Sequence, residues 1–187
     1  MMILEKLKDV NLSDLNDLLT DFQKIMKKQS FAKKEILHTE GSVCNHLFLI
    51  ESGIARSFYY KDGKDITAHF AIENGTITAI DSFIQRKKSR YTIEVLEDSS
   101  ILSISHEDLH KLLEEKPHYE KYVRLFLEQI YIDLADRIED LLFHSAKERY
   151  DKLVKNTPNL LQRVHLKHIA SFIGITQETL SRIRTQV

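Results

Sequence analysis

The chain has 187 residues, 42% of them hydrophobic and 29% charged, a size that allows one large domain or two small ones. Its single cysteine excludes an intramolecular disulfide and a cysteine-held zinc or iron–sulfur centre, and the few glycines and prolines argue against disorder. Residues 145–187 carry eight Lys or Arg against three acids, so their charge is +5 and the remainder carries −6. A basic C-terminal region favours a polyanionic partner.

The chain contains no segment with the length and apolar character of a membrane span. The N-terminus also lacks the apolar stretch of a secretory signal. We therefore expect a cytoplasmic protein with no membrane partner.

The first half of the chain predicts one helix followed by a series of short strands. Apolar residues recur at helical spacing over 12–27. Residues 31–104 then alternate runs rich in β-branched and aromatic residues with turn signals, among which Asp62-Gly63 predicts a tight hairpin. This pattern is typical of a β-sandwich or barrel-like roll. The predicted strands are 35–37, 46–50, 54–60, 65–71, 76–80, 91–96 and 100–105.

After residue 105 the pattern becomes helical, with a short helix over 107–115 and a long helix over 117–143. The long helix carries two apolar stripes, and both must be buried. We expect one stripe on the β domain and the other on the same helix of a second subunit, which gives a homodimer through 117–144. A monomer with this helix between two domains is the alternative. The stripes are Val123, Phe126, Ile130, Leu134, Ile138 and Leu141, and Tyr119, Tyr122, Leu127, Tyr131, Ala135 and Leu142.

The segment from 166 to 187 has the spacing of a helix-turn-helix. Ala170 is small where two helices cross, Gly174 accepts left-handed backbone in the turn, and Thr176 can cap the second helix. Leu180 and Ile183 are apolar residues on its inner face. A helix pair with a solvated charged face is the alternative.

The outer face of the second helix predicts contacts to DNA. Gln177, Glu178 and Arg182 lie where a recognition helix meets base edges, and Ser181 shares their face. Arg can pair with guanine, Glu with cytosine and Gln with adenine. We expect phosphate contacts from a second group of residues, namely Lys167, His168, Ser171 and Arg184.

These segments together resemble the Crp/Fnr family of bacterial transcription regulators. The resemblance rests on Gly41 and Gly53 in the β region, on Gly75, and on Thr-Leu-Ser-Arg-Ile over 179–183. Residues 145–150 and 160–163 are similar to a Bacteroidetes-type branch.

The resemblance implies an α+β fold in which an N-terminal double-stranded β-helix or jelly roll, cyclic-nucleotide-binding-like, precedes a long dimerisation helix and a C-terminal helix-turn-helix. The implied divisions are an effector domain over 1–116, the dimerisation helix over 117–144 and the DNA-binding domain over 145–187. The implied partners are double-stranded DNA and RNA polymerase. The family's Glu and Arg one turn apart match Glu178 and Arg182, whereas Gln177 replaces an Arg, so we expect a different operator. Because the given sequence ends soon afterwards, we expect a reduced β wing; the alternative is that a few further residues follow.

The family's nucleotide-binding cassette is altered in this sequence. The resemblance places a Glu that holds the ribose at Thr76, after Gly75, and a small residue at Tyr91, after the phosphate-binding Arg90. We therefore expect an altered effector pocket, no cofactor, and no binding of cAMP in the usual mode. The alternative is a cyclic-nucleotide-gated regulator that uses Arg90 for the phosphate. Without a nucleotide, Arg90 is expected to pair with Asp81 or Glu94, and residues 85–88 to form a solvated loop tip.

An enzyme and a protein-interaction module are the alternatives to a regulator. An enzyme on a cupin-like roll needs a close pair of histidines, which His38, His46 and His69 do not form, and haem would need one of them as axial ligand. No nucleophile elbow, phosphate-binding loop or zinc-protease motif is present, so we expect no enzyme. The other alternative is an interaction module whose helix-turn-helix no longer binds DNA.

Overall fold

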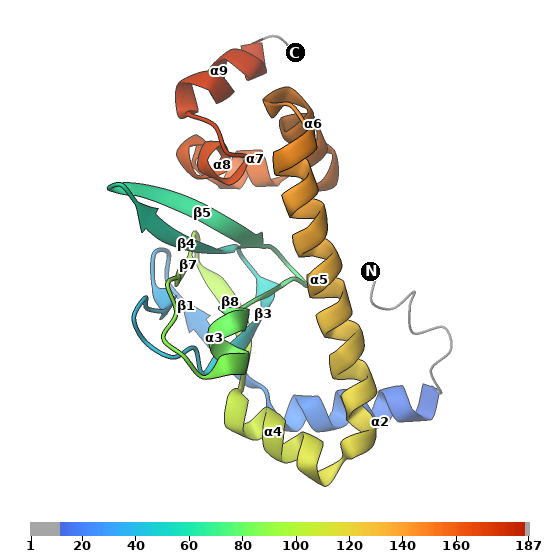
Figure 1. Ribbon diagram of the computed structural model, residues 1–187. Helices are drawn as coiled ribbons and strands as arrows, with labels where there is room; N and C mark the ends of the chain where they lie inside the picture. The colour runs from blue at the N-terminus through green and yellow to red at the C-terminus, as the bar shows by residue number, and fades with distance from the viewer. Residues whose placement is uncertain (1–11, 186–187) are drawn as a thin grey trace.

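The computed structural model describes residues 12–185 (Figure 1). The N-terminal stretch that we expect not to be a secretory signal, and the end of the chain where a wing is expected, lie outside these residues. Within the described range, no helix is both long and apolar enough to cross a membrane.

Two four-stranded antiparallel sheets, with strand orders β1-β8-β3-β6 and β2-β7-β4-β5, form what we call the β-roll. Their inner faces share a core in which Phe48, Ile50 and Ile101 of one sheet meet Ile93 and Val95 of the other. The expected α+β fold with a jelly-roll-like domain is confirmed. The strands are β1 Lys27–Phe31, β2 Ile36–His38, β3 His46–Ser52, β4 Ala55–Lys61, β5 Lys64–Ala71, β6 Thr76–Ile77, β7 Thr92–Val95 and β8 Ser99–Ser105.

Helices flank the β-roll and follow it (Figure 1). α2 and α4 lie at one end of the β-roll, the long α5 runs beside it, and the helices from α6 to α9 lie at the other end. We call α6 to α9 the DNA-binding unit, after the role expected for it. The helices are α2 Leu12–Ile25, α3 Ile80–Gln85, α4 His106–Glu115, the 3₁₀ turn η1 Pro117–Tyr119, α5 Glu120–Phe143, α6 Ala146–Asn156, α7 Leu160–Arg163, α8 Leu166–Phe172 and α9 Gln177–Thr185.

The hairpin expected at Asp62-Gly63 joins β4 to β5. Both residues have positive φ, 51° and 72°, as the two central residues of a type I′ turn require. The hairpin leaves β5 at the edge of its sheet, where α8 lies against it.

Residues 76–80 were expected to form one strand, and this prediction is wrong beyond Ile77. The chain turns at Ala79 into α3, which buries Phe83 against Ile104 and Leu109. The expected solvated loop tip at 85–88 is also corrected in part. Gln85 ends α3, and Arg86 at its C-cap donates to the carbonyl of Cys44 (2.9 Å) and to the side chain of Asn45.

The expected helix over 12–27 ends at Ile25, and the chain then enters β1, which the sequence did not predict. β1 pairs with β8 from Lys27 opposite Ser103 to Phe31 opposite Ser99. Its sequence, KKQSF, is almost fully exposed and shows no apolar alternation, because the strand gains its stability from its backbone pairing with β8.

The buried side and the exposed side of α5 do not coincide with the two expected stripes. Tyr119 in η1 and Tyr122 pack against Leu18 of α2 and Leu112 of α4, so one face is anchored at the base of the β-roll. The residues left exposed include members of each stripe, because the β-roll covers a different sector of the helix than the stripes suggest. These exposed residues are Leu127, Tyr131, Ile132, Leu134, Ile138, Leu141, Leu142 and Phe143.

Candidate DNA-binding site

The turn between α8 and α9 has the geometry of a Schellman closure. Gly174 has φ +75°, the amide of Ile175 donates to the carbonyl of Ala170 (2.9 Å), and the amide of Gly174 donates to that of Ser171 (3.2 Å). An added Cβ on Gly174 would lie 3.3 Å from Leu141 Cδ2, so the turn also packs closely against α5.

The start of α9 is capped as expected. Thr176 Oγ1 accepts a hydrogen bond from the amide of Thr179 (3.3 Å). Glu178 lies in the first turn, where its own backbone amide and the Thr176 side chain hold the pKa of its carboxyl below the usual range. Glu178 is therefore an anion at neutral pH, with a fully ionised acceptor for an exocyclic amine.

The inner face of the helix pair is closed by buried apolar residues. Ile169, Ile173 and Leu180 are at most 1% exposed, and Ala170 lies at the crossing with 2% exposure. This burial fixes which side of α9 points outward. The predicted base-contacting residues Gln177, Glu178, Ser181 and Arg182 are all exposed, as are Arg184 and Lys167.

The structure brings most of the predicted contact residues together. On α9, Gln177, Ser181 and Arg182 are all exposed, and Arg182 Nη2 lies 3.4 Å from Thr179 Oγ1. Lys167 of α8 and Gln177 of α9 line one hollow together with His165 and Leu166, so the starts of the two helices lie side by side.

The predicted phosphate contacts from His168 and Ser171 are wrong. His168 is 6% exposed and faces the β-roll, with its Nδ1 4.0 Å from Asp65 Oδ1. Burial, reinforced by the nearby Arg56, lowers the pKa of His168 to about 4, so it is neutral at physiological pH. Ser171 Oγ accepts from the amide of Thr67 on β5 (3.1 Å). The sequence predicted the helix but not which of its faces meets the β-roll.

The four residues expected at an effector pocket lie on the β-roll as two consecutive pairs, one beside each sheet. Gly75 and Thr76 lie where β6 begins, with Thr76 opposite Leu49 of β3. Tyr91 lies before β7 of the other sheet, and its ring contacts that of Tyr59 edge to face at 5.8 Å. Arg90 is exposed. The expected Arg90–Glu94 pair is corrected, because Glu94 accepts from Arg56 instead (2.7 Å).

A hollow of about 290 Å³ lies elsewhere on the β-roll, around β2 and the start of β3. His38, Cys44 and His46 line it, and none of the four expected effector residues does. Cys44 is fully buried, with its thiol near Thr78 Oγ1 at 3.3 Å. Across residues 12–185, no three His, Cys, Asp or Glu side chains are grouped so that they could hold a metal ion.

The sequence and the fold of this chain are similar to those of several known proteins. Residues 28–116 match the family of the cyclic nucleotide-binding domain. A curated relative, the anaerobic regulatory protein of Bacillus subtilis (strain 168), is 28% identical over 94% of this chain and 77% of its own length. FixK2 from Bradyrhizobium japonicum superposes with a TM-score of 0.73 at 18% identity, over 87% of this chain and 84% of its own. A protein from Eubacterium rectale, described as a transcriptional regulator of the Crp/Fnr family, gives 0.69 at 19% identity, over 95% and 83%.

The β-roll is therefore a domain of the cyclic nucleotide-binding family. Over most of its length the chain is similar to a curated regulatory protein, and its fold is that of solved Crp/Fnr-type transcription regulators; those relatives are not enzymes. The resemblance stated from the sequence is confirmed at this level, and the assignment to a Bacteroidetes-type branch stays a prediction.

Proposed function

We propose that this protein is a sequence-specific DNA-binding transcription regulator that acts as a homodimer in the cytoplasm and contacts RNA polymerase. The observation that carries the proposal is the surface of α9. Its inner face is closed by Leu180 and Ile183, and its outer face presents polar and charged side chains with no apolar residue among them. A recognition helix in the major groove requires this division.

The base-contacting residues have separate roles in the proposal. Arg182 donates to guanine, Glu178 accepts from cytosine N4, and Gln177 pairs with adenine. Lys167 and Arg184 neutralise phosphates and give affinity without sequence choice.

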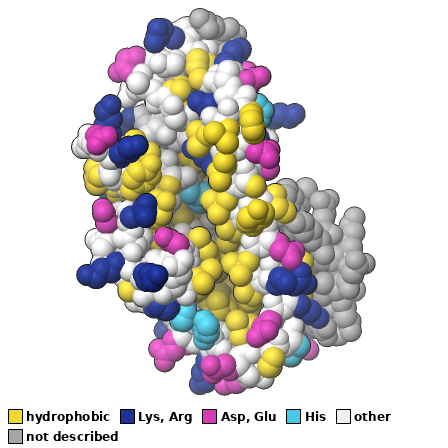
Figure 2. Space-filling model, viewed as in Figure 1, with side chains coloured by type: hydrophobic (Ala, Val, Ile, Leu, Met, Phe, Trp, Pro, Cys, Tyr) yellow, Lys and Arg dark blue, Asp and Glu magenta, His cyan; other side chains and the backbone are white. Residues whose placement is uncertain are grey.

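The homodimer is supported by the exposed side of α5. Leu127, Tyr131, Leu134, Ile138 and Leu141 are spaced by four, three, four and three residues, and each is exposed. This alternation is the repeat of a two-stranded coiled coil. Figure 2 shows apolar side chains gathered along this helix. We call these five residues the α5 seam, and a second copy of the same helix is the partner that fits it.

The effector site is proposed to be altered, so that the protein does not bind cAMP in the usual mode. This part of the proposal is supported by Tyr91, which occupies space beside Tyr59 where the family has a small residue. The second candidate is a cyclic-nucleotide-gated regulator in which the exposed Arg90 holds the phosphate, and the exposure of that side chain favours it.

Selection from randomised duplex DNA with wild-type protein and with Arg182→Ala tests the function. The wild-type protein is expected to enrich a near-palindrome. Arg182→Ala is expected to lose about 1–3 kcal/mol of binding free energy for this palindrome and to accept other bases at one position of each half-site. Ser105→Ala, which removes a helix cap on α4 far from α9, is the control and leaves the selected sequence unchanged. An unchanged sequence preference in Arg182→Ala would contradict the role of Arg182.

A further inference from the structure

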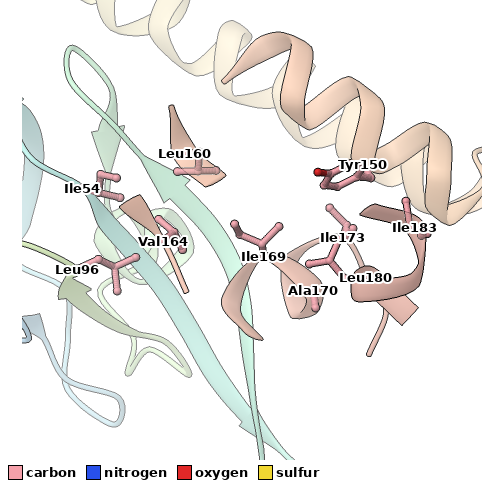
Figure 3. Packing of buried hydrophobic residues seen from close by; sticks show 10 residues of the cluster. All are labelled: Ile54, Leu96, Tyr150, Leu160, Val164, Ile169, Ala170, Ile173, Leu180 and Ile183. Atoms are coloured by element: carbon pink, nitrogen blue, oxygen red, sulfur yellow. The ribbon is translucent and has the colours of Figure 1, made fainter. Parts of the chain in front are cut away.

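The DNA-binding unit and the β-roll share a hydrophobic core. Ile54 and Leu96 of the β-roll lie in one cluster with Leu160, Val164 and Ile169 of the DNA-binding unit. Figure 3 shows Val164 beside Ile54 and Leu96, with the remaining residues of the cluster leading toward α9. The DNA-binding unit is therefore packed onto the β-roll as well as joined to it through α5.

A charged clamp closes the edge of this core. Arg163 at the end of α7 makes a two-pronged pair with Glu73, from Nη2 to Oε1 (2.6 Å) and from Nη1 to Oε2 (3.0 Å). The same guanidinium donates to both oxygens of Glu97, from Nε at 3.3 Å and from Nη2. Both acids lie in turns of the β-roll, and Glu73 also accepts from the amide of Gly53 (3.1 Å). One side chain of the DNA-binding unit thus joins two separate turns of the β-roll.

Arg163 and Glu73 of the clamp are both charged at physiological pH. The Arg163 guanidinium beside Glu73 holds the pKa of that carboxyl well below its usual range. The side chain of Arg163 is 27% exposed, and those of Glu73 and Glu97 are 36% and 31% exposed. The pairs are thus partly shielded from water, and the planar guanidinium fixes direction as well as distance.

Contacts between α8 and β5 also hold the DNA-binding unit against the β-roll. The amide of Thr67 on the edge strand β5 has Ser171 Oγ as its acceptor (3.1 Å), and the rings of Phe70 and Phe172 lie 5.1 Å apart. α8 therefore covers the sheet edge while α9 on its far side keeps its polar face exposed. Docking hides no predicted base-contacting residue.

We propose that Arg163 is a positioning residue that holds the DNA-binding unit on the β-roll in its DNA-competent orientation. This inference rests on the proposed function. In a dimer joined through the α5 seam, the orientation of each DNA-binding unit on its own β-roll fixes the separation of the two recognition helices. The two recognition helices then fit half-sites about one helical turn apart, roughly 34 Å, and the DNA-binding units need not move on binding. Loss of the clamp leaves each recognition helix intact and makes their separation variable.

The test compares Arg163→Gln with wild-type protein on two duplexes, one with the full palindrome selected by the wild-type protein and one with a single half-site. Arg163→Gln is expected to bind the full site roughly tenfold or more weakly. A loss of this size results if the fraction of protein with a docked DNA-binding unit falls to about one tenth. Half-site affinity stays unchanged. Lys155→Gln, which removes an exposed charge of the same unit on α6, is the matched control and leaves both affinities within twofold. Glu97→Gln is expected to weaken binding to the full site in the same way. The double variant with Arg163→Gln should lose less binding free energy than the sum of the two single losses.

Hydrogen exchange of the Thr67 amide measures docking without DNA, and we expect it to quicken in Arg163→Gln. An unchanged full-site affinity, an equal loss on both duplexes, or tighter binding each overturns the proposal. Tighter binding would make the docked state inhibitory, and an equal loss would make Arg163 a direct DNA contact or a purely structural residue. If the wild-type protein selects no sequence, the proposed function fails. An unchanged Thr67 exchange rate in Arg163→Gln then overturns the clamp separately.

Discussion

Arg56 donates two parallel hydrogen bonds to Asp65, from Nη1 to Oδ1 at 2.5 Å and from Nη2 to Oδ2 at 2.6 Å. The guanidinium is 3% exposed and also donates to Glu94, so a nearly buried cation on β4 holds two carboxylates. This cluster lies directly beneath α8, where His168 approaches the same aspartate. The electrostatics of the β-roll and the packing of the DNA-binding unit are therefore linked.

Replacing Arg56 with Met should be strongly destabilising. The substitution keeps most of the apolar volume but leaves Asp65 and Glu94 without their cation, and a broken buried pair costs about 3 kcal/mol. Urea unfolding measures the loss. The control is Lys28→Met, which breaks the exposed pair with Glu51 and should cost less than about 1 kcal/mol. Similar losses in the two variants would contradict the account of the buried cluster.

His168 should make stability depend on pH below neutrality. Its pKa in the folded protein is lowered to about 4 by burial and then by Arg56, whereas an unfolded histidine titrates near its ordinary value. The unfolded state therefore gains the proton first, so stability is lost as the pH falls from about 6.5 toward 4, by up to about 3 kcal/mol.

Unfolding at pH 7.5, 6 and 5 in wild-type protein and His168→Gln isolates this contribution, since all other groups titrate in both. The wild-type protein should lose more stability than the variant over this range. Parallel pH profiles would show that His168 is not buried in its neutral form.

Charge placed in the α5 seam should abolish the dimer. The double variant Leu134→Glu, Ile138→Glu puts four carboxylates into the contact between two helices, and sedimentation should then report a monomer with unchanged helical content. Tyr60→Glu, which changes an aromatic side chain with 63% exposure on β4, is the control and should remain dimeric. A seam variant that still sediments as a dimer would place the interface elsewhere.

Cyclic nucleotides should not stabilise the protein. A ligand at 100 times its dissociation constant adds about 2.7 kcal/mol, so a thermal-shift titration with cAMP and cGMP to millimolar concentration detects binding readily. No shift is expected with either nucleotide. A shift that disappears in Arg90→Gln would instead favour the nucleotide-gated alternative, whereas a shift that survives in that variant would place the nucleotide away from Arg90.

The sequence predicted best those features that depend on neighbouring residues. The helix-turn-helix follows from local requirements at Ala170, Gly174 and Thr176, and the hairpin follows from Asp62-Gly63, because a positive φ can be inferred from the residue type. These features were therefore predicted before any tertiary contact was known.

The errors concern features that depend on distant partners. β1 is polar and exists because β8 offers it a backbone edge, and α3 forms where Phe83 finds a site against α4. His168 and Ser171 lie on a helix face that either DNA or the β-roll might cover, and only the packing onto β5 decides between them. The clamp joins Arg163 to Glu97, which lies 66 positions earlier in the chain, and to Glu73, which lies 90 positions earlier. No local sequence pattern indicates contacts over such separations.

Recognition of a particular DNA sequence is measured by the ratio of the protein's affinities for the selected duplex and for a scrambled one. The measurement uses wild-type protein at about 150 mM salt, because phosphate contacts alone give appreciable binding at low salt. We expect the selected near-palindrome to bind at least about a thousandfold more tightly than a scrambled duplex of the same length. A ratio near one would contradict this expectation, because it would leave only the non-specific attraction of the basic C-terminal region for a polyanion.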